Sequence, residues 1–324
     1  MAIDPYVLGV DAGGTSTRCW AVTTAGLLLG TGVAGPGNFY TVGAEGLADR
    51  ICEVVAAALG EVSGPAEALC LGAAGVGRLQ EAEEVYAALQ RRGLAKRLII
   101  ENDGYISLYA GTLGKPGVVV IAGTGSIAVG IDAGGQRRRA GGWGWLLGDE
   151  GSGYDISRQT LTAILKAADG RMPQLSCAPA VLAQLGVSGP DYLPSALLTL
   201  PDRKERIAGL APLILDAAAE DAIVREIVQK AAAELVQLGL HVHRRLKLPT
   251  SAPIVMAGGL FKHQVMRTAF GRELAQKAPA LEARALPWEA ALGAVFMALN
   301  AAGTSYTKED AAAIAAQVDR KKNQ

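Results

Sequence analysis

One short device occurs twice in this chain and limits the folds that the chain can adopt. An apolar, β-branched run at Tyr6–Val10 ends at an aspartate, and a turn rich in glycine, threonine and serine leads into a second apolar run, Cys19–Thr23. The same order recurs in Val118–Ala122, Gly123–Ser126 and Ile127–Ile131. Runs of this kind predict two strands joined by a tight turn. Two copies at corresponding places in two halves indicate an internal duplication.

The rest of the chain suits two domains. Its 324 residues fit about two domains of roughly 150 residues each. A cluster of glycine and proline at 111–117 marks the boundary between the halves. We expect an N-terminal domain over 1–116 and a C-terminal domain, with a helical insertion, over 117–304; a helix at about 305–320 could pack back on the first domain. Strands mix with helical patterns in both halves, so the fold class is α/β.

Composition excludes several classes of protein. The 31 basic and 31 acidic residues give a formal net charge of zero, so no basic field is present to attract nucleic acid or a membrane surface. The N-terminus is acidic where a signal peptide is basic, and the most apolar run, 116–131, is too short to span a membrane. The four cysteines form no CxxC pair, which favours reduced thiols. We therefore expect a cytoplasmic protein.

The two glycine-rich turns have the composition of phosphate-binding loops. Glycine lets a ligand approach the backbone, whose N–H groups can surround an anion, and threonine and serine add hydroxyl donors. Either turn alone, Gly13–Thr17 or Gly123–Ser126, would be an ordinary β-turn. The match between them favours phosphate binding. The sequence has no GxxxxGK[ST] motif and no GxGxxG that opens a helix, so neither a P-loop enzyme nor a dinucleotide-binding fold is supported.

Two aspartates follow predicted buried strands. Asp11 stands beside the first turn, where a carboxylate is compatible with phosphates only through a cation, and Mg²⁺ takes oxygen ligands of this kind. Asp11 could also accept the N–H groups of the turn. Asp103 stands between the strand Leu98–Ile100 and a predicted helix. It could be the N-cap of that helix or a general base that takes a proton from an attacking hydroxyl, and the residues alone favour neither.

The segment 140–154, AGGWGWLLGDEGSGY, has glycine at six of its fifteen positions. So much glycine is costly in chain entropy, and a plain core segment would not need it. A sugar site needs carboxylate acceptors for hydroxyl groups and an apolar or backbone wall for the ring, and Asp149 and Trp143 offer both. The alternative interpretations are core packing for Trp143 and Trp145 and a helix N-cap for Asp149.

Four motifs, LGVDAGGTSTR, IAGTGSIAVG, GGWGWLLGDEGSGYDI and MAGGLFKH, stand in the order that a known family has. They resemble the N-acetylglucosamine kinase-type sugar kinases of the acyl-CoA dehydratase activator/N-acetylglucosamine kinase ATPase family, within the actin–hexokinase–heat-shock-ATPase superfamily. The resemblance covers roughly residues 6–300 and is most specific at GGWG…GDEGS. It implies two ribonuclease-H-like (actin-like ATPase) domains around a nucleotide cleft, with ATP and Mg²⁺ as cofactors and a homodimer as the assembly.

The resemblance also implies an activity and a role for single residues. The activity is ATP-dependent phosphorylation of an amino sugar, N-acetylglucosamine or glucosamine, at the 6-hydroxyl. Asp103 would be the general base and Asp11 the Mg²⁺ ligand. The residues implied to hold the nucleotide are Gly13, Gly14, Thr15, Gly123, Thr124, Gly125, Gly258 and Gly259. Those implied to contact the sugar are Asn38, Asp103, Ser126, Gly142, Trp143, Gly144 and Asp149.

Two positions depart from the animal members of this family. Ile127 stands where those enzymes have asparagine, and Trp145 where they have histidine; both residues suit bacterial glucosamine or N-acetylglucosamine kinases. Two other functions stay open. An ATPase that activates an electron-transfer enzyme needs cysteines for a bridging iron–sulfur cluster, and this chain has none in a glycine-rich loop. A sugar or nucleotide sensor without turnover would carry a DNA-binding segment or a zinc-binding cysteine cluster, and we expect neither.

Overall fold

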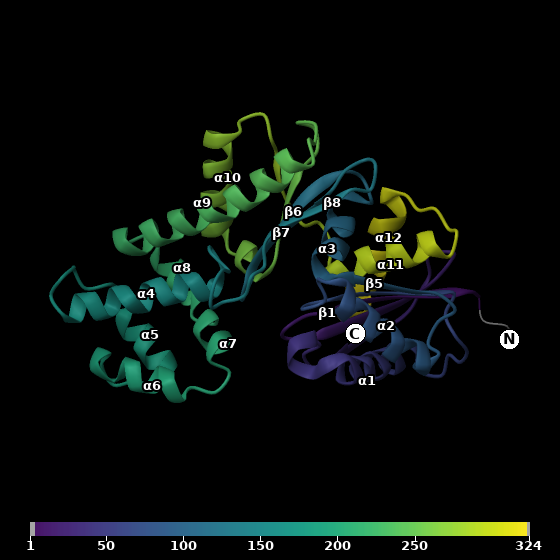
Figure 1. Ribbon diagram of the computed structural model, residues 1–324, viewed down its shortest axis with the longest axis horizontal. Coiled ribbons are helices and arrows are strands. Elements are labelled where there is room, and N and C mark those ends of the chain that lie inside the picture. Colours follow the sequence, from purple (N-terminus) through teal and green to yellow (C-terminus); the bar gives the residue numbers. More distant parts are fainter. Residues whose placement is uncertain (1–3, 323–324) are drawn as a thin grey trace. The chain divides into compact units, whose positions relative to one another are not determined.

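The computed structural model describes residues 4–322, which form two α/β units (Figure 1). The first unit comprises the chain up to Lys115 together with the part from Leu286 onward, and the second spans Pro116–Ala285. The first boundary thus falls one residue before the predicted one. Each unit contains one five-stranded sheet that mixes parallel and antiparallel strands.

The sheet of the first unit consists of an antiparallel meander extended by two parallel strands. The meander is β1 (Tyr6–Ala12), β2 (Thr17–Thr23) and β3 (Leu28–Ala34). β4 (Ala68–Ala73) pairs parallel to β1 on its free side, and β5 (Leu98–Asn102) pairs parallel to β4. The spatial order is therefore β3-β2-β1-β4-β5. The glycine-rich turn after β1 lies at the end of the sheet where the carboxyl ends of the parallel strands β1, β4 and β5 meet.

The sheet of the second unit repeats this topology. β6 (Gly117–Ala122), β7 (Ser126–Ile131) and β8 (Arg137–Gly141) form the meander, and β9 (Ile254–Ala257) and β10 (Ala283–Ala285) add the two parallel strands. The order β10-β9-β6-β7-β8 matches that of the first sheet strand for strand. The repeated strand–turn–strand device that the sequence predicted is therefore present in both sheets, and the two sheets share one topology. The sequence did not reveal β10, because three residues are too few to show an alternating pattern.

Helices cover both faces of the first sheet. Successive side chains of β1 point to opposite faces, so each face has apolar residues that a helix must cover. Leu8 and Val10 face α1 and α2, and Val7 faces α11. The sequence predicted a helix only from Gly46, but α1 begins at Phe39 and continues across an interruption at Gly43, where φ is 68°. The helices of this unit are α1 (Phe39–Leu59), α2 (Leu79–Arg92), α3 (Asp103–Thr112), α11 (Ala290–Ala301) and α12 (Lys308–Lys322).

The helix α11 lies in the first unit, although we expected residues up to 304 in the second. Leu292, Val295 and Phe296 are fully buried in a cluster with strands β1, β2 and β4. The periodic sequence predicted the helix correctly, but a helix that is apolar on nearly all sides does not indicate which sheet it covers. α12 packs on the same unit: the side chain of Gln317 accepts a hydrogen bond from the Leu28 amide at 2.9 Å.

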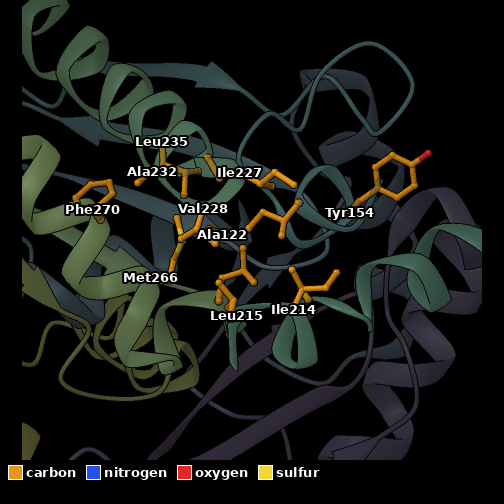
Figure 2. Close-up of a cluster of buried hydrophobic side chains, with 14 of the residues drawn as sticks. Ala122, Tyr154, Ile214, Leu215, Ile227, Val228, Ala232, Leu235, Met266 and Phe270 are labelled. Carbon is orange, nitrogen blue, oxygen red and sulfur yellow. The ribbon is translucent and has the colours of Figure 1, made fainter. Parts of the chain in front are cut away.

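The core of the second unit lies between its sheet, the helices inserted between β8 and β9, and the helix α10 that follows β9. Figure 2 shows side chains from β6, α4, α8, α9 and α10 in this cluster, among them Ala122, Tyr154, Leu215, Val228, Leu235 and Phe270. The helices of this unit are α4 (Gly153–Ala168), α5 (Ala178–Leu185), α6 (Leu193–Thr199), α7 (Arg203–Ala208), α8 (Ala211–Ala217), α9 (Ala222–Arg245) and α10 (Gln264–Lys277), with short 3₁₀ helices η1 (Pro190–Tyr192) and η2 (Gly259–Lys262).

Two expectations from composition can be compared with the fold. Cys19, Cys70 and Cys177 are buried and Cys52 is half-buried, and all four are free thiols, as predicted. Within residues 4–322, no helix combines the length and the apolar character that a membrane span requires.

Gly9 of β1 and Gly293 of α11 allow α11 to approach its neighbours, and this generates a prediction about stability. A Cβ added at Gly293 would lie 1.9 Å from the carbonyl oxygen of Ile106, so Gly293→Ala must push α11 away from α3. We expect a loss of about 3 kcal/mol in the free energy of unfolding, measured by denaturant titration. Gly271→Ala on α10 is the matched control, because a Cβ there meets no atom within 4 Å; it should stabilise by about 0.5–1 kcal/mol. Equal stability of the two variants would contradict this account.

Candidate active site

The first glycine-rich turn is held by backbone hydrogen bonds and leaves part of its backbone open. The Gly13 amide donates to the Ser16 carbonyl at 3.0 Å, and the Gly13 carbonyl accepts from the Gly37 amide at 2.9 Å. Gly14 has no atom within 4 Å of the place where a Cβ would stand, and its φ lies outside the left-handed region. The fold itself therefore does not require glycine at this position. Thr15 is exposed beside it.

Asp11 and Asp103 come together at the edge of the first sheet where β1, β4 and β5 end. Asp11 pairs with Gly72 of β4, and β5 ends one residue before Asp103. Burial, and then the negative charge of Asp103, raise the pKa of Asp11 to about 7. Burial raises the pKa of Asp103 to about 6, although backbone amides at the start of α3 oppose this shift. The two carboxyl groups therefore lie within electrostatic reach of each other.

Asp103 is not the N-cap of α3, so that interpretation is wrong. The cap is Asn102, whose side-chain oxygen accepts a hydrogen bond from the Gly104 amide at 3.0 Å. Asn38 has the same role at α1, where it accepts from the Tyr40 amide at 2.9 Å. The capping bond uses the oxygen of the Asn38 amide.

Sequence reasoning missed two charged residues that act on this site. Arg18 stands directly opposite Asp11 across the β1–β2 ladder and lowers its pKa. Its Nε lies 3.9 Å from a carboxylate oxygen of Glu289, which precedes α11 and raises the pKa of Asp11. The hairpin register could have revealed Arg18, because a tight turn places it across from Asp11. Nothing in the sequence connects Glu289 with β1.

The second glycine-rich turn is anchored to the start of α4. The amides of Gly153 and Tyr154 donate to the carbonyls of Gly123 and Thr124 at 2.8 and 3.4 Å. A Cβ at Gly123 would lie 3.9 Å from the Gly259 amide nitrogen, so this turn and the start of η2 are neighbours. A Cβ at Gly259 would meet no atom within 4 Å. The second unit therefore has two adjoining stretches of open backbone.

Gly258, by contrast, is required by the fold itself. Its φ is 96°, and a Cβ there would lie 2.4 Å from the carbonyl oxygen of Ala122. Beyond η2, a pocket of about 440 Å³ lies between α9 and α10. The side chains of Gln229, Gln264 and Arg272 are among its lining. Amide and guanidinium groups of this kind can pair with the polar edge of a bound molecule.

Asp149 is a buried carboxylate that holds the second turn, and it is not a helix cap. One oxygen accepts from the Ser126 amide at 3.2 Å, and the other lies 3.7 Å from the Lys204 ammonium nitrogen. A Cβ at Gly125 would lie 2.7 Å from this carboxylate, so glycine is needed there. The N-cap of α4 is Ser152, which overturns the alternative interpretation of Asp149.

The environment of Asp149 leaves it with unused hydrogen-bonding capacity. Its φ is 61°, in the left-handed region, and only 4% of the residue is exposed. Burial raises the pKa of its carboxyl, against the opposing effects of the Ser126 amide and the Lys204 ammonium. Among the described residues, its Oδ2 has no hydrogen-bond partner. The Ser126 hydroxyl donates to the Glu150 carbonyl at 2.7 Å and so ties the turn to the same segment.

The tryptophans of segment 140–154 are on the surface, so the core-packing interpretation is wrong. Trp143 is 66% exposed and Trp145 39% exposed. The guanidinium carbon of Arg139 lies 4.8 Å from the centre of the Trp143 ring. Gly142 and Gly144 flank Trp143 with φ of 69° and 86°, values that other residues rarely adopt. The glycines therefore fix a backbone path that presents Trp143 to solvent.

Two mixed sheets of one topology, each with a glycine-rich turn after its first strand, form a fold that the chain shares with ROK family kinases. The chain aligns with a ROK family glucokinase from Streptomyces griseus, solved in complex with glucose and AMPPNP, with a TM-score of 0.55 at 21% identity. That alignment covers 90% of this chain and 98% of the glucokinase. Residues 8–298 match the BadF/BadG/BcrA/BcrD ATPase family. The chain belongs to this family.

Within this family, the chain is similar to N-acetylglucosamine kinases. It is 29% identical to the N-acetylmuramic acid/N-acetylglucosamine kinase of Clostridium acetobutylicum, over 90% of this chain and 98% of the relative. It is 30% identical to the N-acetyl-D-glucosamine kinase of Dictyostelium discoideum, over 90% and 97%. A candidate N-acetylglucosamine kinase from Chromobacterium violaceum superposes with a TM-score of 0.77 at 28% identity, over 91% and 99%. The protein is thus an N-acetylglucosamine kinase-like ATPase, and the suspected family is confirmed.

The raised pKa of Asp103 predicts how Asp103→Asn changes stability. The folded state binds the proton of this carboxyl more tightly than the unfolded chain does, because the pKa rises from 3.8 to about 6 on folding. The resulting cost to folding is absent well below pH 3.8, grows between the two pKa values and is complete above pH 6. The neutral asparagine avoids this cost. Its stabilising effect should therefore be larger at pH 8 than at pH 5, by about 1 kcal/mol.

Denaturant titrations of both proteins at the two pH values measure this difference. Asp319→Asn, at an exposed position on α12, is the matched control for the loss of an aspartate charge. An Asp103→Asn effect that is the same at both pH values would show that the carboxyl is not held in a desolvated place.

Proposed function

We propose that this protein transfers the γ-phosphoryl group of ATP to the 6-hydroxyl of an amino sugar, N-acetylglucosamine or glucosamine. The observation that carries the proposal is the pair of half-buried carboxyl groups, Asp11 and Asp103, at the carboxyl ends of strands in the first sheet. Asp103 suits a general base, and Asp11 suits a cation that accompanies phosphates. Two carboxyl groups in different environments can take different roles in one reaction.

Asp103 has the properties that a general base needs near neutral pH. Its pKa of about 6 leaves it ionised at pH 7.5 and makes it a stronger base than an exposed aspartate. In the proposed step, the sugar hydroxyl gives its proton to the Asp103 carboxylate. The hydroxyl oxygen forms a bond to the γ-phosphorus as the bond from that phosphorus to the β–γ bridging oxygen breaks, and ADP leaves.

Asp11 would hold Mg²⁺, directly or through water. Burial and the charge of Asp103 raise the pKa of the Asp11 carboxyl to about 7. A cation at this place would relieve the repulsion between the two carboxyl groups. Oxygen ligands suit Mg²⁺, which when bound would neutralise charge on the phosphate oxygens. Arg18, opposite Asp11, adds positive charge from the protein itself.

The open backbone in each unit supports phosphate binding. Nothing in the fold requires glycine at Gly14 or Gly259, since a Cβ at either meets no atom within 4 Å. Absence of a side chain leaves their N–H groups accessible to an anion. We propose that the turns Gly13–Thr15 and Gly123–Gly125 bind phosphate oxygens. The adenosine would lie against Gly258 and Gly259, where the neighbouring pocket between α9 and α10 combines apolar walls with glutamine and arginine side chains and so suits a nucleobase.

The sugar would be recognised by groups that have unused capacity. In the first unit, the amide nitrogen of Asn38 can donate to a hydroxyl. In the second unit, Asp149 has a buried oxygen without a hydrogen-bond partner in the described part of the chain, and Trp143 offers an exposed ring. Ser126, Gly142 and Gly144 shape the backbone around them. A homodimer remains a prediction, which light scattering on the purified protein would test.

The test of this function is ADP release from Mg·ATP against a panel of sugars. The panel contains glucosamine, N-acetylglucosamine, N-acetylmannosamine, N-acetylmuramic acid and glucose. We expect release that depends on an amino sugar, and NMR of the product identifies the phosphorylated hydroxyl. Asp103→Asn should lower kcat by about 10²–10⁴ and leave the Kd of ATP unchanged. A variant with near-normal kcat would exclude Asp103 as the base. ATP hydrolysis that no sugar changes, together with bound iron, would indicate an electron-transfer activator.

The open position at Gly14 predicts a separable effect on nucleotide binding. Gly14→Ala should leave the melting temperature unchanged, because the new methyl group meets no protein atom. It should raise the KM for ATP by roughly tenfold, or about 1.4 kcal/mol, because the methyl group occupies space that a phosphate needs. Gly271→Ala serves as the control, with its Cβ equally free of contacts. An unchanged KM for ATP in Gly14→Ala would contradict phosphate binding by this turn.

A further inference from the structure

The short helix α7 brings a lysine to the second glycine-rich turn. The start of α4 shows how closely α7 approaches: a Cβ at Gly153 would lie 3.0 Å from the Gly123 carbonyl oxygen and 3.2 Å from the Ala208 carbonyl oxygen. The turn and the last residue of α7 therefore meet beside Gly153. Lys204 precedes Ala208 by four residues, so the two side chains share one face of the helix.

The Lys204 ammonium lies on the side of the turn where Asp149 is buried. Its nitrogen is 3.7 Å from Asp149 Oδ2, and the same oxygen would lie 2.7 Å from a Cβ at Gly125. Ammonium, carboxylate and glycine backbone thus form one cluster. The lysine side chain is 28% exposed, whereas Asp149 is buried. The ammonium is therefore the more accessible member of the pair.

The ion pair leaves the ammonium able to bind a second anion. A distance of 3.7 Å is too long for a hydrogen bond, and an ammonium carries three N–H donors. The other oxygen of Asp149 accepts from the Ser126 amide at 3.2 Å, so the counter-ion of the lysine is itself fixed to the turn. Glu150, the other charged neighbour that acts on Asp149, is an acid and cannot replace Lys204 as a partner for phosphate.

We propose that Lys204 binds the γ-phosphate of ATP at the turn Gly123–Gly125 and stabilises the charge on that group during transfer. The inference rests on the proposed kinase activity, in which this turn binds phosphate oxygens and Asp149 contacts the sugar. Because Lys204 adjoins both, the phosphate within its reach is the one nearest the sugar hydroxyl. Positive charge directed at the transferred group is a principal means of catalysis in phosphoryl transfer. The lysine keeps its proton throughout, and the hydroxyl proton still passes to Asp103.

The experiment compares the Kd of AMPPNP, a non-hydrolysable analogue of ATP, with the Kd of ADP, both with Mg²⁺ and measured by calorimetry. Lys204→Met should raise the Kd of AMPPNP by roughly 10- to 100-fold, the loss expected for one hydrogen bond between charged groups. The Kd of ADP, which has no γ-phosphate, should stay unchanged. Lys204→Arg keeps the charge and should restore most of the affinity. In the kinase assay, Lys204→Met should also lower kcat at saturating ATP, because the contact strengthens in the transition state.

A second pair of variants separates phosphate binding from a role as counter-ion only. Lys204→Met leaves the buried Asp149 carboxylate without its cation, which destabilises the turn. Asp149→Asn removes that charge, so Lys204→Met added in this background tests the phosphate contact alone, and the rise in the Kd of AMPPNP should persist. Lys230→Met is the matched control, because Lys230 lies exposed on α9 and pairs with Glu226 at 2.7 Å. It should change neither Kd.

Two results would overturn the role of Lys204. One is a Kd of AMPPNP that Lys204→Met does not change in the Asp149→Asn background, which would make the lysine a counter-ion only. The other is an equal loss of affinity for AMPPNP and ADP in that background. In both cases, sugar-dependent release of ADP by the wild type would leave the kinase proposal intact. A wild type that binds neither nucleotide would overturn both proposals.

Discussion

The first unit depends on a constraint that its sheet imposes: parallel strands end on the same side of the sheet, so two carboxyl groups that follow such strands lie within electrostatic reach of each other. Asp11 and Asp103 are in that position, and each has a pKa above its ordinary value because burial disfavours the charged form. The raised pKa values mean that ionisation of the two groups costs stability, and α11 packs closely on the strand and helix that carry them, through Gly9 and Gly293. A cation and a proton-donating hydroxyl are the partners that such a site is suited to receive.

The second unit uses the same topology for a different purpose. Its glycine-rich turn follows the first strand as in the first unit, but the carboxylate beside it, Asp149, comes from a later segment and lies against Gly125. The inserted helices then bring Lys204 to the far side of that carboxylate. The two units thus share the turn after the first strand, and the inserted helices give the second turn a charged neighbour that comes from outside the sheet.

Much of the fold and part of the site could be predicted from the sequence, and the errors have specific causes. The repeated turns and the aspartates were visible because they are local patterns. The capping alternatives for Asp103 and Asp149 could not be resolved, because Asn102 and Ser152, a few residues away at most, are equally good caps. The tryptophans were ambiguous because composition does not indicate which side of a loop faces solvent. Glu289 was missed because its relation to Asp11 exists only after α11 has packed on the sheet.

The sequence by itself determined the local features: which segments become strands, where glycine opens the backbone, and which acidic residues end the strands. These follow from side-chain periodicity and from conformational preferences that act within a few residues. Only the tertiary structure decided which unit α11 joins, how closely Asp103 approaches Asp11, and that Lys204 lies beside Asp149. Those outcomes depend on how helices pack against sheets, and packing joins residues that lie far apart in the chain and share no local pattern.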